Sequence, residues 1–98
     1  MLEKQVEAKL VSEVKKRGGL ALKFVSPGFD GVPDRIVLMP GGKAIFVECK
    51  APGKKLRALQ IYRSLQIGRL GFYCCYLDHP DKVEPLLEEV MSDEVYPS

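Results

Sequence analysis

The hydrophobic positions near the N-terminus recur at the spacing of one helix face. They form a single stripe at intervals of three and four residues: Leu2, Val6, Leu10, Val11 and Val14. Basic residues at 15–17 complement the negative C-terminal end of a helix, and a Gly-Gly pair follows them. The pattern predicts a helix over residues 2–17.

Three segments after this helix have the composition of β-strands. LALKFVS (20–26) alternates loosely between apolar and polar positions, while RIVLM (35–39) and KAIFVECK (43–50) are joined across Pro-Gly-Gly. This joined pair predicts a β-hairpin. Between the first and second strands, SPGFDGVP (26–33) is dense in Gly and Pro and predicts a loop.

The second half of the chain predicts a helix, a strand and a helix. Residues 56–69 carry apolar side chains on more than one side, as expected of a helix buried between a sheet and a partner. GFYCCYLD (71–78) is a nearly continuous apolar and aromatic run, which is typical of an inner strand. Residues 81–91 predict a final acidic helix with Pro85 in its first turn, and the last residues, SDEVYPS, are expected to be loose. The expected order is α-β-β-β-α-β-α, an α/β fold in a single domain of residues 1–98.

The composition is that of a soluble globular protein in a reducing compartment. Hydrophobic residues make up 46% of the chain and charged residues 29%. No apolar run approaches the ~20 residues of a membrane span, and the charged start MLEKQVEAKL is no signal peptide. The cysteines offer neither a disulfide framework nor the CxxC spacing of a zinc site. We therefore expect a cytoplasmic protein with no membrane partner.

The net charge of +2 conceals two regions of opposite sign. Residues 1–77 hold 14 Lys/Arg against 6 Asp/Glu, a balance of +8, and residues 78–98 hold 1 against 7, a balance of −6. The stretch 50–69 contains basic residues and no acidic ones, and a run of this kind is often only a solvated helix face. Here it begins within the motif described next, which favours binding of a polyanion such as nucleic acid. The residues expected to contact it are Lys54, Lys55, Arg57 and Arg63.

That motif consists of two short pieces. Pro33-Asp34 precedes the second strand, and Glu48-Cys49-Lys50 ends the third. Because alternate side chains of a strand share a face, Glu48 and Lys50 should point to one side and Cys49 to the other. The hairpin should then bring Asp34 and Glu48 together at one end of the sheet.

Two carboxylates and one ammonium group suit metal-assisted hydrolysis of a phosphodiester. Mg²⁺ prefers oxygen ligands and is usually held by one or two carboxylates with water and phosphate. Asp34 and Glu48 would supply the carboxylates, and the main-chain carbonyl of Cys49 would be a third ligand. Lys50 would orient the attacking water or neutralise charge in the transition state. Taken singly, each residue has an ordinary explanation, as a turn carboxylate or as part of an exposed cross-strand face.

The combined string GVPDRIVLMPGGKAIFVECKAPGKKLRALQ resembles the VRR-Nuc (virus-type replication–repair nuclease) branch of the PD-(D/E)xK nuclease superfamily. The resemblance covers nearly the whole chain, from the N-terminal helix through LKFVSPG to GFYCCYL. It implies a restriction-endonuclease-like core, with the expected order of elements and a mixed central sheet flanked by helices. It also implies a Mg²⁺- or Mn²⁺-dependent nuclease. Small stand-alone members of this family resemble Holliday junction resolvases and act as homodimers, and many are phage-encoded.

The resemblance assigns residues to the site one position at a time. Three motif positions match directly: Asp34, Glu48 and Lys50. Gln60 matches the glutamine of the following helix and would hold the lysine or a phosphate oxygen, the alternative being an ordinary polar helix residue. Glu7 aligns with a glutamate of the first helix and would reach the metal, if not directly, through water. Glu3 is the alternative to Glu7, although an acidic residue near a helix start is favourable in itself.

Two classes of function compete. The first is a divalent-metal-dependent endonuclease that acts on structured or branched DNA as a homodimer. The second is a non-catalytic nucleic-acid-binding subunit that retains the nuclease fold. Binding alone has no need of carboxylates that repel phosphate, so the intact Asp34, Glu48 and Lys50 favour the nuclease. The apolar strand 71–77 and the second helix carry more hydrophobic residues than one small sheet needs, which favours a symmetric dimer.

Overall fold

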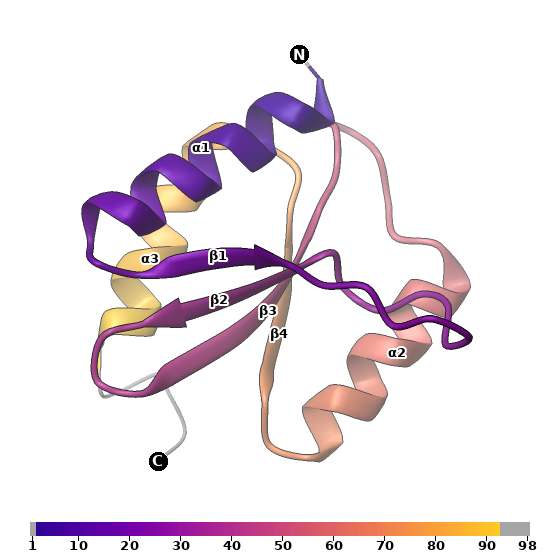
Figure 1. The fold of residues 1–98 in the computed structure, drawn as a ribbon. Coiled ribbons are helices and arrows are strands. Elements are labelled where there is room, and N and C mark those ends of the chain that lie inside the picture. The colour runs from indigo at the N-terminus through magenta and orange to yellow at the C-terminus, as the bar shows by residue number, and fades with distance from the viewer. Residues whose placement is uncertain (1, 93–98) are drawn as a thin grey trace.

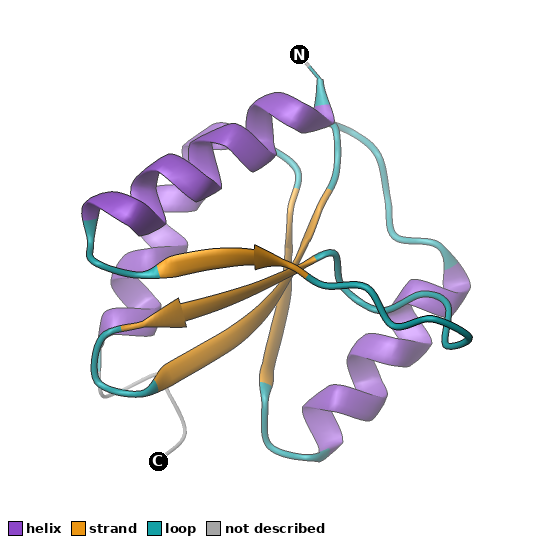
Figure 2. Ribbon diagram, viewed as in Figure 1, coloured by secondary structure: helices purple, strands orange, loops and turns teal. Residues whose placement is uncertain are grey.

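A computed structural model describes residues 2–92, which form a four-stranded sheet with helices on both sides (Figures 1 and 2). The elements in chain order are α1 (Glu3–Lys16), β1 (Leu20–Lys23), β2 (Arg35–Met39), β3 (Lys43–Cys49), α2 (Ala58–Arg69), β4 (Tyr73–Leu77), the single 3₁₀ turn η1 (Pro80–Lys82) and α3 (Val83–Met91). The order α-β-β-β-α-β-α predicted from the sequence is confirmed. The loose C-terminal end falls on residues 93–98, outside the described part of the chain.

The sheet is mixed, with the strands in the order β1-β2-β3-β4. The first two pairings are antiparallel and place Arg35 of β2 opposite Lys23 of β1 and Val47 of β3. β3 and β4 run parallel, with Glu48 opposite Tyr76, so the chain must cross over between them. α2 lies in this crossover and contacts β4, on the side of the sheet away from α1 and α3 (Figure 1).

β4 is an edge strand and not the inner strand that its composition predicts. Among the described residues it pairs with β3 alone. The apolar run arises because one side of β4 packs in the core while the other side faces α2, where Tyr76 still keeps 45% of its surface exposed. Leu77 is buried among the core residues, whereas Phe72, just before the strand, faces α2. An apolar run without polar residues at alternate positions therefore indicates that both faces of a strand have packing partners. It does not indicate whether the strand lies inside the sheet or at its edge.

α1 and α3 bury one face of the sheet. Val6, Leu10 and Val14 of α1 are fully buried, as the helical stripe predicts. Leu2 and Val11 do not belong to that stripe, because their exposed fractions are 58% and 36%. Leu2 precedes the first helical residue and has extended backbone, and Val11 is one position, about 100°, around the helix from Leu10. The buried residues of α3 are Val83, Leu86, Leu87 and Val90.

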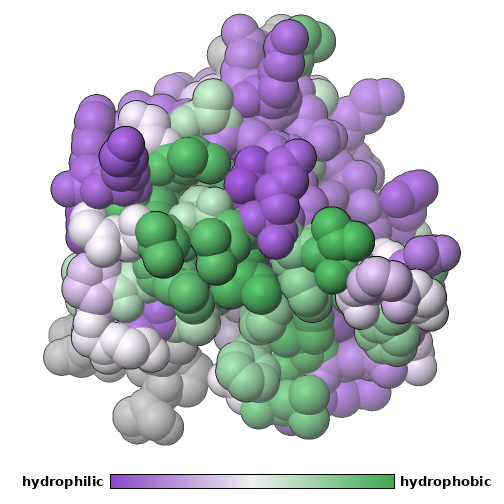
Figure 3. Space-filling view, in the orientation of Figure 1, coloured by the Kyte–Doolittle hydropathy of each residue, from purple (hydrophilic) through white to green (hydrophobic). Residues whose placement is uncertain are grey.

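The other face of the sheet is covered only in part. β1 and β2 expose Leu20, Leu22 and Leu38 there, while the alternate residues Ala21 and Val37 face the core. Figure 3 shows hydrophobic side chains gathered over these strands and continuing toward α2. The rings of Phe24, Phe46 and Phe72 form a row across this face, with centroid distances of 5.7 Å and 5.8 Å. None of the helices in residues 2–92 is long and apolar enough to cross a bilayer.

A candidate metal and nucleic-acid site

The β2–β3 hairpin brings the two halves of the sequence motif together. Asp34 immediately precedes β2, and Pro33 before it is fully buried, which fixes the entry of the chain into the strand. The backbone N–H of Cys49 donates a hydrogen bond to Oδ1 of Asp34 at 3.2 Å. Glu48 is the next residue back along β3 and is itself buried. The carboxyl end of β3 and the start of β2 thus hold the two acidic residues side by side.

Asp34 is in an environment that disfavours its charge. Burial raises the pKa of Asp34 to about 7, and the negative charge of Glu48 contributes in the same direction. The hydrogen bond from Cys49 opposes this rise without cancelling it. A carboxylate kept in such surroundings gains the most from a cation, and perturbed carboxylates of this kind gather at functional sites.

Glu48 is held by a residue of α2 and by the residue that follows the end of β3. Nε2 of Gln60 donates to Oε2 of Glu48 at 3.2 Å, and Oε1 of Gln60 accepts from the backbone N–H of Arg57 at 2.9 Å. Nζ of Lys50 lies 3.9 Å from the same Oε2 of Glu48. Burial raises the pKa of Glu48, while the ammonium group of Lys50 acts to lower it. Gln60 therefore connects the N-terminus of α2 to Glu48 and does not contact Lys50 through any hydrogen bond between described residues.

The first helix contributes two acidic residues to Asp34. Carboxylate oxygens of Glu3, Glu7 and Asp34 all lie within 4.8 Å of one another. The sequence left Glu3 as an alternative to Glu7. In the structure both residues lie beside Asp34, because the first turns of α1 face the start of β2. Glu48 is not a member of this group of three, since its carboxylate faces Gln60 and Lys50. Asp34 therefore lies between the glutamates of α1 and Glu48 of β3.

Arg35 is the residue of this region for which sequence reasoning found no role. Its Nη2 donates to Oε2 of Glu7 at 2.8 Å, and its Nη1 donates to the carbonyl of Ala21 at 3.2 Å. Burial acts to raise the pKa of Glu7, but the hydrogen bond and charge of Arg35 outweigh it and lower that pKa overall. The only signal in the sequence is the position of Arg35 directly after the motif aspartate, because its partner is 28 residues away.

The donor set suits a hard divalent cation. Three carboxylates converge at one end of the sheet, and a fourth, that of Glu48, adjoins them. Mg²⁺ and Mn²⁺ prefer such oxygen ligands, whereas thiolates favour softer metals. Cys49 is fully buried, and the burial of its thiol raises the pKa well above the usual range, so the sulfur stays protonated. The residues present therefore fit a magnesium-type site and not a zinc-thiolate site.

The predicted nucleic-acid-binding residues differ in their surroundings. Lys54, Lys55 and Arg57 are exposed in the segment between β3 and the start of α2. Arg57 also lines a hollow of about 400 Å³ together with Asp30, Gly31, Leu59 and Gln60. Arg63 is half-buried, and its guanidinium group is occupied by contacts within the protein. Three of the four residues are thus exposed between β3 and α2, and Arg57 is close enough to Glu48 to act to lower the pKa of that carboxyl.

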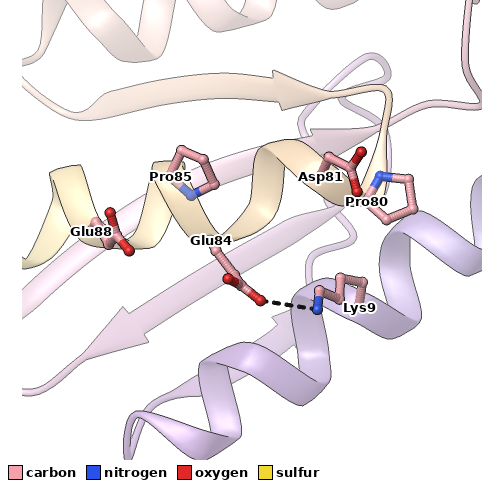
Figure 4. A pocket seen from close by; sticks show the side chains of 6 residues that line it. All are labelled: Lys9, Pro80, Asp81, Glu84, Pro85 and Glu88. Atoms are coloured by element: carbon pink, nitrogen blue, oxygen red, sulfur yellow. Dashed lines mark hydrogen bonds and ion pairs between the residues drawn. The ribbon is translucent and has the colours of Figure 1, made fainter.

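A second hollow, of about 330 Å³, lies between α1 and α3 (Figure 4). Its charged lining is mostly acidic: Asp81, Glu84, Glu88 and one lysine, Lys9. Nζ of Lys9 is committed to Oε1 of Glu84 at 3.1 Å. A polyanion would be repelled here, so nucleic acid belongs to the basic side of the molecule.

Comparison with known proteins agrees with this geometry. No protein-family model matches the chain. The protein "Putative nuclease p44" of Acyrthosiphon pisum secondary endosymbiont phage 1 is 53% identical over 79 residues, which are 81% of this chain and 85% of that protein. A solved structure described as a VRR_NUC domain has a TM-score of 0.82 at 26% identity, covering 88% of this chain and 94% of that one. The chain belongs to the VRR-Nuc family.

Membership in the VRR-Nuc family confirms the resemblance found in the sequence and the restriction-endonuclease-like core that it implies. The Pro-Asp and Glu-x-Lys pieces on which that resemblance rests are carried by the β2–β3 hairpin, with Asp34 before β2 and Glu48 in β3. The roles of the individual residues are part of the proposal that follows.

Proposed function

We propose that this protein is a divalent-metal-dependent endonuclease that cleaves branched or otherwise structured DNA as a homodimer. The observation that supports it most strongly is the convergence of Glu3, Glu7 and Asp34, with Glu48 and Lys50 beside them. Four acidic residues at one end of a sheet repel one another, and burial increases the cost. A bound divalent cation would offset this repulsion, so such a cluster is expected where a protein binds a cation beside a phosphate.

Each side chain has a defined task in phosphodiester hydrolysis. Asp34 and Glu48 would hold the ion, with Glu7 and the main-chain carbonyl of Cys49 as further oxygen donors. A bound Mg²⁺ or Mn²⁺ supplies Lewis-acid stabilisation and a more acidic water. Lys50, 3.9 Å from Glu48, would orient the attacking water or neutralise charge on the phosphoryl oxygens. Gln60 would keep the carboxylate of Glu48 in a fixed orientation through its 3.2 Å hydrogen bond.

DNA is the proposed substrate because the site adjoins a cationic segment. Lys54, Lys55 and Arg57 lie in the segment that follows the proposed catalytic Lys50, and all three are exposed. The acidic side chains of α3 lie on another part of the molecule, so the charge would orient a polyanion toward the site. The 53%-identical relative from a phage also carries the name of a nuclease. A phage-encoded nuclease would act on DNA in the cytoplasm of the host cell.

Branched DNA and a homodimer are proposed together. The open sheet face and helix α2 carry exposed apolar residues: Leu20, Leu22, Leu38, Leu59, Ile61, Tyr62 and Leu65. Phe72 links the two areas, because it packs on Phe46 of β3 and lines a hollow of about 520 Å³ beside α2. A second copy covering this surface would form a two-fold dimer with two Asp34/Glu48 sites. Two symmetric sites suit a junction with two symmetric strands to cut.

The experiment that tests this proposal is a nicking assay. Supercoiled plasmid and a panel of synthetic junctions, flaps and linear duplexes are incubated with Mg²⁺, with Mn²⁺ or with a chelator. We expect metal-dependent nicking of covalently closed plasmid, which requires an endonuclease, and faster cleavage of the junctions than of the linear duplexes. Binding to junctions without cleavage under any metal condition would instead favour the non-catalytic binding subunit.

A further inference from the structure

The loop between β1 and β2 is closed at its base by Asp34 itself. The backbone N–H of Phe24, the first residue after β1, donates to the carbonyl oxygen of Asp34 at 2.8 Å. Inside the loop, the N–H of Phe29 donates to the carbonyl of Ser26 at 3.0 Å and forms a turn. The chain from 24 to 34 is therefore a loop closed at its base, and its last residue carries the motif carboxylate.

Arg63 of α2 binds the outer part of this loop. Its Nε donates to the carbonyl oxygen of Asp30 at 2.7 Å, and its guanidinium carbon lies 3.7 Å from the centroid of the Phe29 ring. Its Nη1 donates to Oε1 of Gln66 at 2.9 Å, one turn further along the same helix. A planar guanidinium that stacks on a ring while donating along its edge is a directed contact, which a lysine ammonium cannot reproduce.

Gly31 brings the loop into direct contact with α2. A Cβ at this position would lie 2.7 Å from Cγ of Leu59 and 3.1 Å from the Leu59 carbonyl oxygen. Gly31 also has a φ of +89°, a conformation that residues with side chains rarely adopt. The loop thus lies flat on the first turns of α2, three residues before Asp34, and Arg63 holds it there.

We infer that Arg63 is a positioning residue that holds the loop 24–33 on α2, and through this loop Asp34, rather than a residue that binds DNA phosphate. The sequence assigned Arg63 to the phosphate-binding set because it belongs to the basic stretch 50–69. The contacts with Asp30, Phe29 and Gln66 already use its Nε, the face of its guanidinium and its Nη1. This inference rests on the proposed nuclease function for its effect on catalysis.

The contact of Arg63 with the loop also connects the two segments on either side of the site, the loop 24–33 and α2. The loop leads into Asp34, and α2 begins with Arg57 and Gln60, which are linked to Glu48. The hollow of about 400 Å³ between loop and helix is bounded by Asp30 and Gly31 on one side and by Arg57, Leu59 and Gln60 on the other. Its width depends on the Arg63 contact, so this contact sets the spacing between the carboxylates and the cationic surface at Arg57.

Two substitutions at Arg63 separate positioning from phosphate binding. Arg63→Lys keeps the charge and loses the stack and the directed hydrogen bond, whereas Arg63→Gln loses the charge as well. If Arg63 positions the loop, both variants lose kcat alike, on the order of 10-fold for a small displacement of the reacting groups. Their KM values and the salt dependence of DNA binding stay close to those of the wild type. If Arg63 binds phosphate, only Arg63→Gln is impaired, and its log–log salt slope falls by roughly 0.9.

A spectroscopic experiment tests the same contact without any cleavage. The chain contains no Trp, so Phe29→Trp places a single tryptophan at the stacked position, and its emission is read with excitation at wavelengths that tyrosine does not absorb. Phe29 is 43% exposed, which leaves room for the larger indole. We expect the emission of Phe29→Trp to shift to longer wavelength and its anisotropy to fall when Arg63→Lys is added. Unchanged emission and anisotropy in the double variant would overturn the inference.

The two proposals fail in distinguishable ways. A wild-type protein that cleaves no DNA with any divalent metal refutes the proposed function, and the fluorescence comparison still decides whether Arg63 holds the loop. A wild-type protein that cleaves DNA, with Arg63→Lys at full kcat and normal fluorescence, refutes the inference alone. Circular dichroism of each variant shows whether the fold is kept, and a kcat that falls only near the melting temperature would indicate a purely structural role and overturn the inference.

Discussion

The backbone N–H of Cys49 donates to Oδ1 of Asp34 across the start of β2 and the end of β3, at 3.2 Å. This hydrogen bond fixes one carboxylate oxygen before any ligand arrives. The amide belongs to Cys49, the last residue of β3, so the strand that carries Glu48 also orients the carboxylate of Asp34. The site is therefore set by the register of one hairpin, in which Arg35 lies opposite Val47.

Removing either carboxylate of the hairpin should abolish cleavage and keep DNA binding. For Asp34→Ala and Glu48→Ala we expect the cleavage rate to fall on the order of 100-fold or more, because the ion is lost. DNA binding should be unchanged or tighter, since a negative charge that repels phosphate is gone. Cleavage and binding are measured on the same labelled junction. Glu88→Ala, in the acidic hollow between α1 and α3, is the matched control and should behave as the wild type. Full activity in either site variant would exclude the proposed assignment.

Lys50 should affect the rate and not the binding of the ion. Its ammonium lies 3.9 Å from Glu48 and supplies no lone pair to a metal. We expect Lys50→Ala to lose on the order of 100-fold in kcat, the size of effect seen when one group that stabilises transition-state charge is removed. Isothermal titration calorimetry with Mn²⁺ should show binding close to that of the wild type. Loss of the calorimetric signal in Lys50→Ala would contradict this role.

Asp34 should make the metal-free protein less stable as pH rises. The folded-state pKa is raised from 3.8 to about 7, so between about pH 4 and pH 7 the folded protein keeps a proton that the unfolded chain has released. The contribution of Asp34 to the free energy of unfolding is thus fully present below about pH 4 and is lost as the pH rises to about 7. Above that pH it no longer changes. In urea unfolding with a chelator present, the free energy of unfolding of Asp34→Asn should rise relative to that of the wild type between about pH 4 and pH 7, because Asn does not titrate. A stability difference independent of pH would show that the Asp34 pKa is not raised.

The local structure around the site could be predicted because its signals are local. The Pro-Gly-Gly turn and the alternation on either side of it define the hairpin, and the hairpin brings Asp34 and Glu48 together. Gln60 was found only through the family resemblance, since a polar residue in the first turn of a helix is common. Its 3.2 Å hydrogen bond with Glu48 joins residues 12 apart across the crossover from β3 to α2.

The contacts that the sequence could not predict join residues distant in the chain. Arg35 pairs with Glu7 over 28 residues, and Arg63 binds the Asp30 carbonyl over 33. A basic residue in a basic stretch looks the same whether it faces solvent or a folded-back loop, so composition gave no sign of the contact between Arg63 and the loop. The edge position of β4 was missed for a related reason, because residue type reports burial and not the number of neighbouring strands.

The exposed lysines and arginine before α2 should account for part of the salt dependence of binding. Lys54, Lys55 and Arg57 are exposed and, if each contacts one phosphate, their replacement by Gln should lower the log–log salt slope by roughly 0.9 per residue on duplex arms. Fluorescence anisotropy with a labelled junction at several salt concentrations measures this slope. Lys82→Gln is the control, because Lys82 is paired with Asp78 at 2.7 Å near the acidic helix. An unchanged slope in the triple variant would mean that this segment is only solvated.

The last prediction concerns the homodimer. Light scattering at tens of micromolar protein should give twice the 10.9 kDa mass of one chain. Leu22→Lys on the open sheet face and Leu65→Lys on α2 each place a charge in the proposed interface, where the two side chains are 46% and 53% exposed in the single chain. Both should shift the mass toward that of a monomer, because a buried ammonium without a partner is costly. Met91→Lys is the control, because Met91 is an apolar residue at the end of α3 that is also exposed, at 40%; this variant should stay dimeric. A wild-type protein that remains monomeric both alone and with junction DNA would refute the dimer, and a dimer unaffected by Leu22→Lys and Leu65→Lys would place its interface elsewhere.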